Sequence, residues 1–176
     1  MTWNAVHSRA EVLRAVAAAA DARLDGRLPL DVDGARAVFA DELDLLGALQ
    51  LRWHTRLAGR IERELMSQPL DLEAAVVRAW QATADELPGI RAVLDHHRSH
   101  PADDAMAHAM AIATAKEHAL LAVMAGRAGT ADRGAAAVGA VLESKARATH
   151  RPVRRDVAPP SGPGRFLDRL KAALAA

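Results

Sequence analysis

Apolar residues recur at helical spacing through residues 39–65 of the chain. This stretch contains no proline, and at 100° per residue its large apolar side chains fall on one side of a single helix. The members of this stripe are Phe39, Leu43, Leu46, Leu49, Trp53, Leu57, Ile61 and Leu65. Leu45 and Leu51 widen the apolar surface, as in a helix that packs against neighbours on more than one side. The pattern predicts a long central helix whose opening segment is capped by Asp31 or Asp33.

Similar stripes predict helices before and after the central one. Ser8 and Glu11 form a capping-box pattern that opens a first helix over residues 9–24. A later stripe runs through residues 76–94 and is interrupted by Pro88. Either the helix kinks at this proline, or a new helix begins with the proline at its first position. Two more helices are predicted over residues 102–125 and 131–147, and the second of these is expected to bury Val138, Val141 and Leu142.

The composition supports an all-α fold. Tyrosine is absent, and the chain has two Phe and three Trp, so few aromatic runs are available for a sheet. We expect an all-α up-and-down bundle of four to five helices over residues 1–148. Four prolines and two glycines then predict a flexible linker over residues 149–164. Residues 165–176 regain a helical stripe and are predicted to form a short amphipathic helix.

One carboxylate lies where the pattern predicts the core. Glu117 is at the centre of the apolar face of the helix predicted over residues 102–125, and a buried carboxylate must be paired, hydrogen-bonded, protonated or metal-bound. Gln50 and His54 interrupt the stripe of the central helix, and Thr83 interrupts the next one. These four residues predict a polar layer across the bundle. It is either a satisfied network that holds the helices in register, which we favour, or a pocket for a metal or small molecule.

Evidence for metal binding or catalysis is slight. His96 and His100 have the i, i+4 spacing of some divalent-metal sites, but they also fall in the last turn of a helix, where the helix dipole favours imidazolium. No nucleophile elbow, phosphate-binding loop or dinucleotide-binding fingerprint occurs. Gly34, Gly47 and Gly59 lack the spacing of such loops, and we attribute them to close helix packing. Nothing in the sequence argues for an enzyme, and no cofactor is favoured.

The charge is distributed unevenly along the chain. Residues 143–176 carry eight basic and three acidic side chains, a net charge of +5, which leaves −4 for the rest of a chain whose total is +1. A helix of about twelve residues is marginal alone in water, so the predicted tail helix needs a surface on which to fold. The residues expected to dock are Phe166, Leu167, Leu170 and Leu174. A protein partner or self-association is the first expectation, peripheral membrane contact the second, and nucleic acid is disfavoured because interleaved aromatic residues are lacking.

Two functions remain open at this point. The first is a non-enzymatic interaction or assembly protein whose C-terminal amphipathic helix docks to a protein partner. The alternative is a bundle that binds a metal or small molecule at the polar layer around Glu117, His54 and Gln50. This alternative leaves open whether the protein is an enzyme. Because the first residues lack an apolar core and the longest apolar run is far too short to span a bilayer, we expect a cytoplasmic location.

Overall fold

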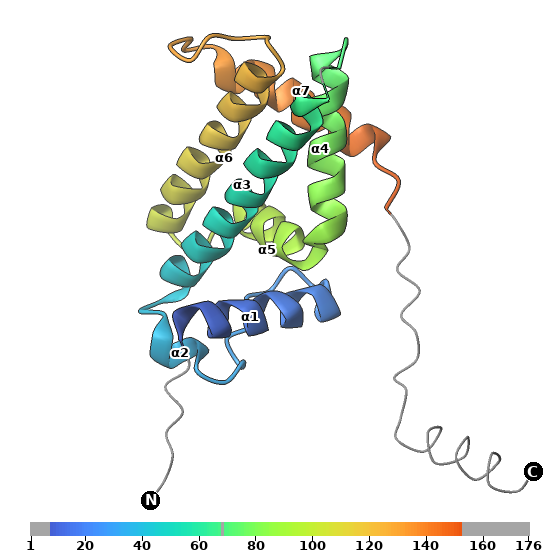
Figure 1. The fold of residues 1–176 in the computed structure, drawn as a ribbon. Helices are drawn as coiled ribbons and strands as arrows, with labels where there is room; N and C mark the ends of the chain where they lie inside the picture. The colour runs from blue at the N-terminus through green and yellow to red at the C-terminus, as the bar shows by residue number, and fades with distance from the viewer. Residues whose placement is uncertain (1–7, 68, 153–176) are drawn as a thin grey trace, which may run out of the picture.

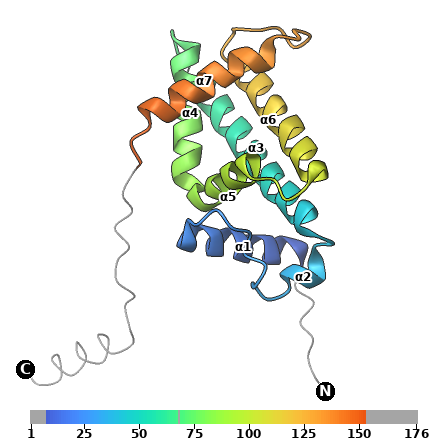
Figure 2. The same ribbon diagram turned by 180° about the vertical axis from the view of Figure 1, so that it is seen from behind.

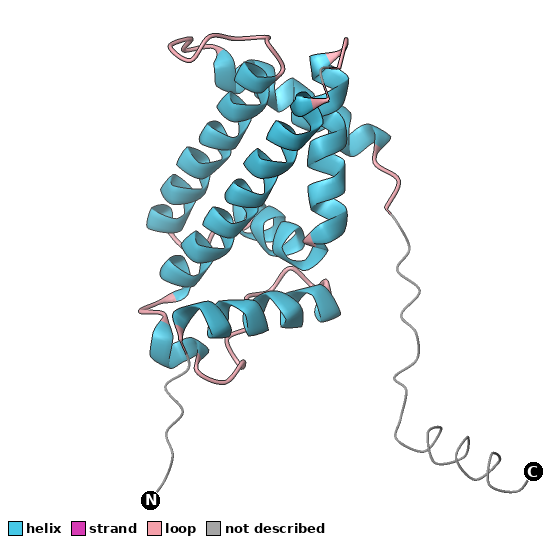
Figure 3. Cartoon of the chain, in the orientation of Figure 1, coloured by secondary structure: helices cyan, strands magenta, loops and turns pink. Residues whose placement is uncertain are grey.

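The computed structural model describes residues 8–67 and 69–152, and within these ranges the chain forms helices and no strand (Figure 3). The elements in chain order are α1 (Arg9–Arg23), α2 (Ala35–Val38), α3 (Glu42–Met66), α4 (Leu72–Glu86), α5 (Pro88–Ser99), α6 (Asp104–Met124) and α7 (Ala135–Thr149). The all-α prediction is confirmed. No helix in the described ranges combines the length and the apolar composition needed to cross a membrane.

The long helix α3 lies at the centre of the arrangement (Figure 1). It contacts α1, α4, α5 and α6, while the most extensive contacts between helices join α6 to α7, α3 to α4, and α1 to α5. Figure 1 shows α4 and α6 running beside α3, with α1 crossing near its N-terminal end. Figure 2 shows α5 and α7 crossing on the opposite side of the molecule. One face of α3 is therefore covered by other helices, and the other is left open.

The central helix begins later than the sequence pattern predicts. Its N-cap is Asp41, whose side chain accepts a hydrogen bond from the backbone N–H of Asp44 at 2.7 Å. Gly34, the N-cap of α2, has a φ of +80°, and Phe39, its C-cap, is extended, so α2 is a short helix that does not continue into α3. Asp31 and Asp33 therefore do not cap the central helix. Periodicity alone missed this break because Phe39 is buried, as a residue in the stripe of a continuous helix would be.

The two alternatives at Pro88 are resolved by the backbone. Leu87 has non-helical angles, and α5 begins with Pro88 at its first position, where the missing N–H costs no helical hydrogen bond. The N–H of Gly89 donates to Asp21 of α1 at 2.8 Å. The capping box of Ser8 and Glu11 forms as predicted. The change of direction between α4 and α5 is thus tied to α1.

The core contains most residues of the predicted apolar stripes. Trp53 and Trp80 are buried and meet edge to face, with ring centroids 5.9 Å apart. Leu51, however, is 67% exposed and Val141 is 68% exposed, so the prediction that they are buried is wrong. In α7 the buried positions lie at i, i+4, i+7, i+8 and i+11, which is one face of the helix. They are Ala135, Gly139, Leu142, Glu143 and Ala146. Val141 lies on the opposite side of the helix.

The end of α7 still packs on the bundle. His150, the residue after α7, lies edge-on to Trp80 with ring centroids 6.3 Å apart, and its Nε2 is 3.0 Å from a carboxylate oxygen of Asp85. Helix and packing thus continue slightly past residue 148, the boundary expected for the bundle. The predicted tail helix over residues 165–176, and all of the predicted linker after residue 152, lie outside the described residues.

Two glycines mark the closest approaches between helices. A Cβ built on Gly139 of α7 would lie 1.8 Å from the carbonyl oxygen of His118 in α6. A Cβ built on Gly89 of α5 would lie 2.1 Å from the carbonyl carbon of Ala20 in α1. Backbone atoms cannot move aside as a flexible side chain can, so each contact requires glycine.

We expect Gly139→Ala to destabilise the protein by about 2 kcal/mol, because the added methyl group meets the α6 backbone. Gly59→Ala in α3 is the matched control, since a Cβ there meets nothing within 4 Å. That control should stabilise the helix by about 0.5–1 kcal/mol, because alanine loses less backbone entropy than glycine. Urea unfolding of both variants measures the difference. If Gly139→Ala were as harmless as Gly59→Ala, the close packing of α7 on α6 would be refuted.

Candidate functional site

Glu117 of α6 is buried, as its place in the apolar stripe predicted, with 3% of its surface exposed. The indole Nε1 of Trp80 donates a hydrogen bond to its carboxylate at 3.2 Å. The guanidinium of Arg91 lies 3.4 and 3.5 Å from the two carboxylate oxygens. The carboxylate of Glu117 is therefore held by one residue of α4 and one of α5.

Arg91 of α5 is also buried. It is 7% exposed, and it forms a second ion pair with Asp95, one turn along the same helix, at 2.8 Å. Its guanidinium also lies over the ring of Trp53, 4.7 Å from the ring centroid. Within the described residues the buried Nε of Arg91 and Nε1 of Trp53 have no hydrogen-bond partner, so this stacked pair carries a desolvation cost.

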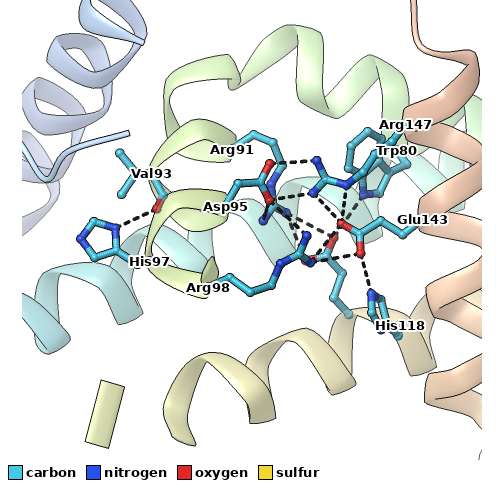
Figure 4. Close-up of polar contacts among 10 residues, drawn as sticks. Trp80, Arg91, Val93, Asp95, His97, Arg98, His118, Glu143 and Arg147 are labelled. Atoms are coloured by element: carbon cyan, nitrogen blue, oxygen red, sulfur yellow. Dashed lines mark hydrogen bonds and ion pairs between the residues drawn. The ribbon is translucent and has the colours of Figure 1, made fainter. Parts of the chain in front are cut away.

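Glu143 of α7 is a second buried carboxylate, and it lies beside Asp95 and Arg98 of α5 (Figure 4). It is 5% exposed, and Nε2 of His118 donates to it at 2.6 Å. Arg98 of α5 and Arg147 of α7 bind the same carboxylate at 3.1 Å and 2.6 Å. Asp95 joins the two halves, since it also pairs with Arg147 at 2.7 Å.

These contacts form one charged cluster that spans α5, α6 and α7. It consists of Arg91, Asp95, Arg98, Glu117, His118, Glu143 and Arg147. Three carboxylates face three guanidinium groups, and every carboxylate has at least two partners. Figure 4 shows the labelled members of the cluster, Arg91, Asp95, Arg98, His118, Glu143 and Arg147, converging between the helices. Groups that are already paired with one another leave little free capacity to bind a substrate or a metal.

The electrostatics of Glu143 follow from its partners. Burial by itself raises the pKa of this carboxyl, but the hydrogen bond from His118 and the attraction of Arg147 and Arg98 outweigh burial and hold the pKa well below its ordinary value. Burial likewise lowers the pKa of Arg147, and its bonds to Asp95 and Glu143 more than offset that effect. The ionised form of each group is thus the stable one at neutral pH.

The polar layer predicted from the sequence forms only in part. Thr83 is buried, but its hydroxyl donates to the carbonyl of Ala79 in its own helix at 2.7 Å. Gln50 and His54 are half-buried on α3, and within the described residues no hydrogen bond or ion pair joins either of them to Glu117. The spacing of apolar residues correctly predicted that Glu117 is buried. It did not identify the helices that supply the partners of Glu117.

The residues that complete the cluster were missed, although the sequence contains a signal for two of them. Arg91 is four positions after Leu87 and three before Leu94, both buried, so it lies in the apolar stripe of its helix. Glu143 stands in the same relation to Gly139 and Ala146 of α7. Opposite charges embedded in two apolar stripes indicate a buried pairing, but they do not identify which pairs form.

The metal-binding hypothesis at His96 and His100 gains no further ligand. The two rings stack with centroids 5.2 Å apart. No group of three or more metal-ligating side chains occurs in the part of the chain that the structure describes. His97 between them is buried, and its Nδ1 lies 2.8 Å from the carbonyl oxygen of Val93, one helical turn back.

A second candidate site is a groove of about 1150 Å³ along the open face of α3. The start of α1 and the end of α4 line its sides. Gly47 and Gly59 also line it, and a Cβ on either glycine meets nothing within 4 Å, so the prediction that they allow close helix packing is wrong. The charged residues that line the groove are Arg9, Asp44, Arg52, Arg56, Arg63 and Glu86.

We expect Glu117→Ala to destabilise the protein by about 3 kcal/mol, because Arg91 and Trp80 lose a buried acceptor. Glu117→Gln should cost less, since its amide oxygen still accepts from Trp80. Glu62→Ala, an exposed substitution on α3, is the control and should change stability by less than about 0.5 kcal/mol. Unfolding in urea provides the comparison. An unchanged stability for Glu117→Ala would contradict the buried pairing.

The lowered pKa of Glu143 predicts an acid-dependent stability. Because the folded-state pKa lies below the ordinary value of 4.5, the contribution of this carboxylate is complete above that pH and is lost as the pH falls below it. The charged groups that face it are Arg98 and Asp95 from α5, His118 from α6 and Arg147 from α7.

Glu143→Gln should therefore lower stability at pH 7 and make the loss of stability between pH 5 and pH 3 shallower than in the wild type. The measurement is the free energy of unfolding at several pH values, with exposed Glu62→Gln as the control. Parallel curves for wild type and Glu143→Gln would argue against a strongly paired Glu143.

Comparison with known proteins finds no relative for this chain. No family model matches it, and neither a curated protein nor a solved structure does. The meaning of both sites therefore rests on the contacts described above: a charged cluster whose members pair with one another, and an open groove on α3.

Proposed function

We propose that the protein is a non-enzymatic interaction or assembly protein, in which the bundle is a scaffold and its surface binds a protein partner. The observation that carries this proposal is the groove along α3. Its α3 lining runs from Asp44 to Arg63, a helix face of about 28 Å at 1.5 Å per residue. A groove of this length suits a segment of another protein, because helix-in-groove recognition uses several turns of contact.

The charged cluster supports a structural role for the interior. Ion pairs and hydrogen bonds occupy both Glu117 and Glu143, and they connect three helices that are separate in sequence. The alternative function, a metal or small-molecule site around Glu117, His54 and Gln50, has less support because neither Gln50 nor His54 reaches Glu117 in the described part of the chain.

The C-terminal segment is the second part of the proposal. Phe166, Leu167, Leu170 and Leu174 form an apolar stripe in the sequence, but they lie outside the described residues, so tail docking stays a prediction. The expected occupant of that contact is a protein partner or a second copy of the chain, with peripheral membrane contact as the less favoured outcome. The cytoplasmic location inferred from the sequence also stays a prediction.

Deletion of residues 161–176 tests the tail. The melting temperature should stay nearly unchanged, because the proline-rich segment before the tail offers little apolar surface to the core. The same deletion should abolish self-association or co-purification with the partner, and so should Leu170→Asp, which places a charge in the stripe. Ser161→Asp adds the same charge outside the stripe and is the control. Differential scanning calorimetry and analytical ultracentrifugation supply the two readouts.

Two results would contradict docking of the tail to a protein. A melting temperature lower by about ten degrees after deletion would make the tail part of the fold. Association with anionic vesicles that disappears at high salt, and on neutralising Arg165, Arg169 and Lys171, would indicate a membrane surface instead.

A further inference from the structure

The groove along α3 contains two arginines that the bundle does not use. Arg9 pairs with Asp44 at 2.6 Å, and Arg56 pairs with Glu86, so the two carboxylates of the groove are already neutralised. Arg56 also lowers the pKa of Glu86 through that bond, which keeps the carboxyl ionised. Arg52 and Arg63 form no hydrogen bond or ion pair with any residue that the structure describes. The groove therefore presents two positive charges that no described residue neutralises.

The two arginines lie on one line along the helix. They are eleven positions apart, which is three helical turns and about 16 Å, and at 100° per residue their directions differ by about 20°. Both therefore occupy the same edge of the open face. Anionic groups on an extended or helical ligand that runs along α3 can reach both.

Part of the groove surface is apolar. Leu51 is 67% exposed within the groove, and Leu13 and Leu87 line its sides. Gly47 and Gly59 present no side chain, so the backbone of an approaching segment can come close to α3. A large exposed leucine in the same groove as two arginines without partners among the described residues matches a ligand that is apolar on one side and acidic on its edge.

Charge disfavours two occupants from the protein itself, the predicted tail helix and a second copy of the chain. The predicted tail helix carries Arg165, Arg169 and Lys171 against Asp168 alone, so it brings positive charge to a groove that is already positive. In a symmetric dimer through this face, the groove of one copy meets the identical groove of the other. Four arginines and two carboxylates line each groove, so such a dimer repels itself.

We infer that the groove on α3 binds an acidic amphipathic helix of a partner protein. The apolar side of that helix packs on Leu51 and the glycine positions, and its carboxylates pair with Arg52 and Arg63. This inference rests on the proposed function, because it specifies the partner of an interaction protein, and it places that contact on the bundle rather than on the tail.

Two synthetic peptides test the inference on the full-length protein. Both have 18 residues and leucines at helical spacing on one face; the remaining positions are glutamate in one peptide and lysine in the other. Fluorescence anisotropy of the labelled peptides measures the dissociation constants at low and physiological salt. Wild-type protein should bind the glutamate peptide at least tenfold more tightly than the lysine peptide.

The decisive variant is Arg52→Glu with Arg63→Glu, which should reverse that preference. Its matched control is Arg36→Glu with Arg133→Glu, since both of these arginines are exposed away from the groove and the change in net charge is identical. The control should keep the preference of the wild type. Leu51→Asp should weaken binding of the glutamate peptide at least tenfold. Circular dichroism confirms that all variants stay folded.

Equal binding of both peptides, no binding of either, or a charge-reversed pair that behaves like its control would overturn the inference. Binding of duplex DNA through Arg52 and Arg63 in place of the glutamate peptide would also overturn it. The proposed function fails separately: it is rejected if neither the groove variants nor deletion of residues 161–176 changes any protein association. If tail deletion abolishes association but the peptides do not bind, only the groove inference is lost.

Discussion

The buried carboxylates of Glu117 and Glu143 impose the strongest constraint on this bundle. An ionised carboxylate loses several kcal/mol of hydration when it is buried, and only close cationic or hydrogen-bonding partners offset that loss. Because the partners come from different helices, α5, α6 and α7 have to meet in one register for both groups to be satisfied. Gly139 allows α7 to approach α6 closely enough for His118 to reach Glu143. Register and close packing thus depend on each other.

The arginines of the charged cluster are paired with carboxylates, whereas two arginines on the open face of α3 are not, in the part of the chain that the structure describes. In the charged cluster, Arg91 and Arg147 are matched by carboxylates and lie against Trp53 and Trp80, so they stabilise the arrangement of helices. On the open face, Arg52 has no hydrogen bond or ion pair within the described residues, and it adjoins the exposed Leu51. Paired charges fix a structure, whereas uncommitted charges beside apolar surface are available for recognition. The proposed function follows from this contrast.

Local chemistry explains why the helices were predictable and why one boundary was not. The cap at Ser8 acts on backbone groups within a few residues, so it is visible in the sequence, and it forms in the structure. The predicted start of the central helix was wrong because Phe39 continues the apolar stripe across the non-helical segment between α2 and α3. Apolar periodicity reports which residues are buried, and a buried residue next to a helix satisfies it as well as one inside.

The sequence by itself determined the fold class, the faces of the helices and the inward position of Glu117, because these depend on spacing within one segment. The tertiary structure decided which faces meet. It paired Glu117 with Arg91 instead of Gln50 or His54. It also placed Gly139 in a tight contact and left Gly59 open, although both lie inside helices. Periodicity defines a direction around one helix axis, but the packing of several helices selects the neighbour in that direction, and that choice depends on the fit of all the faces together.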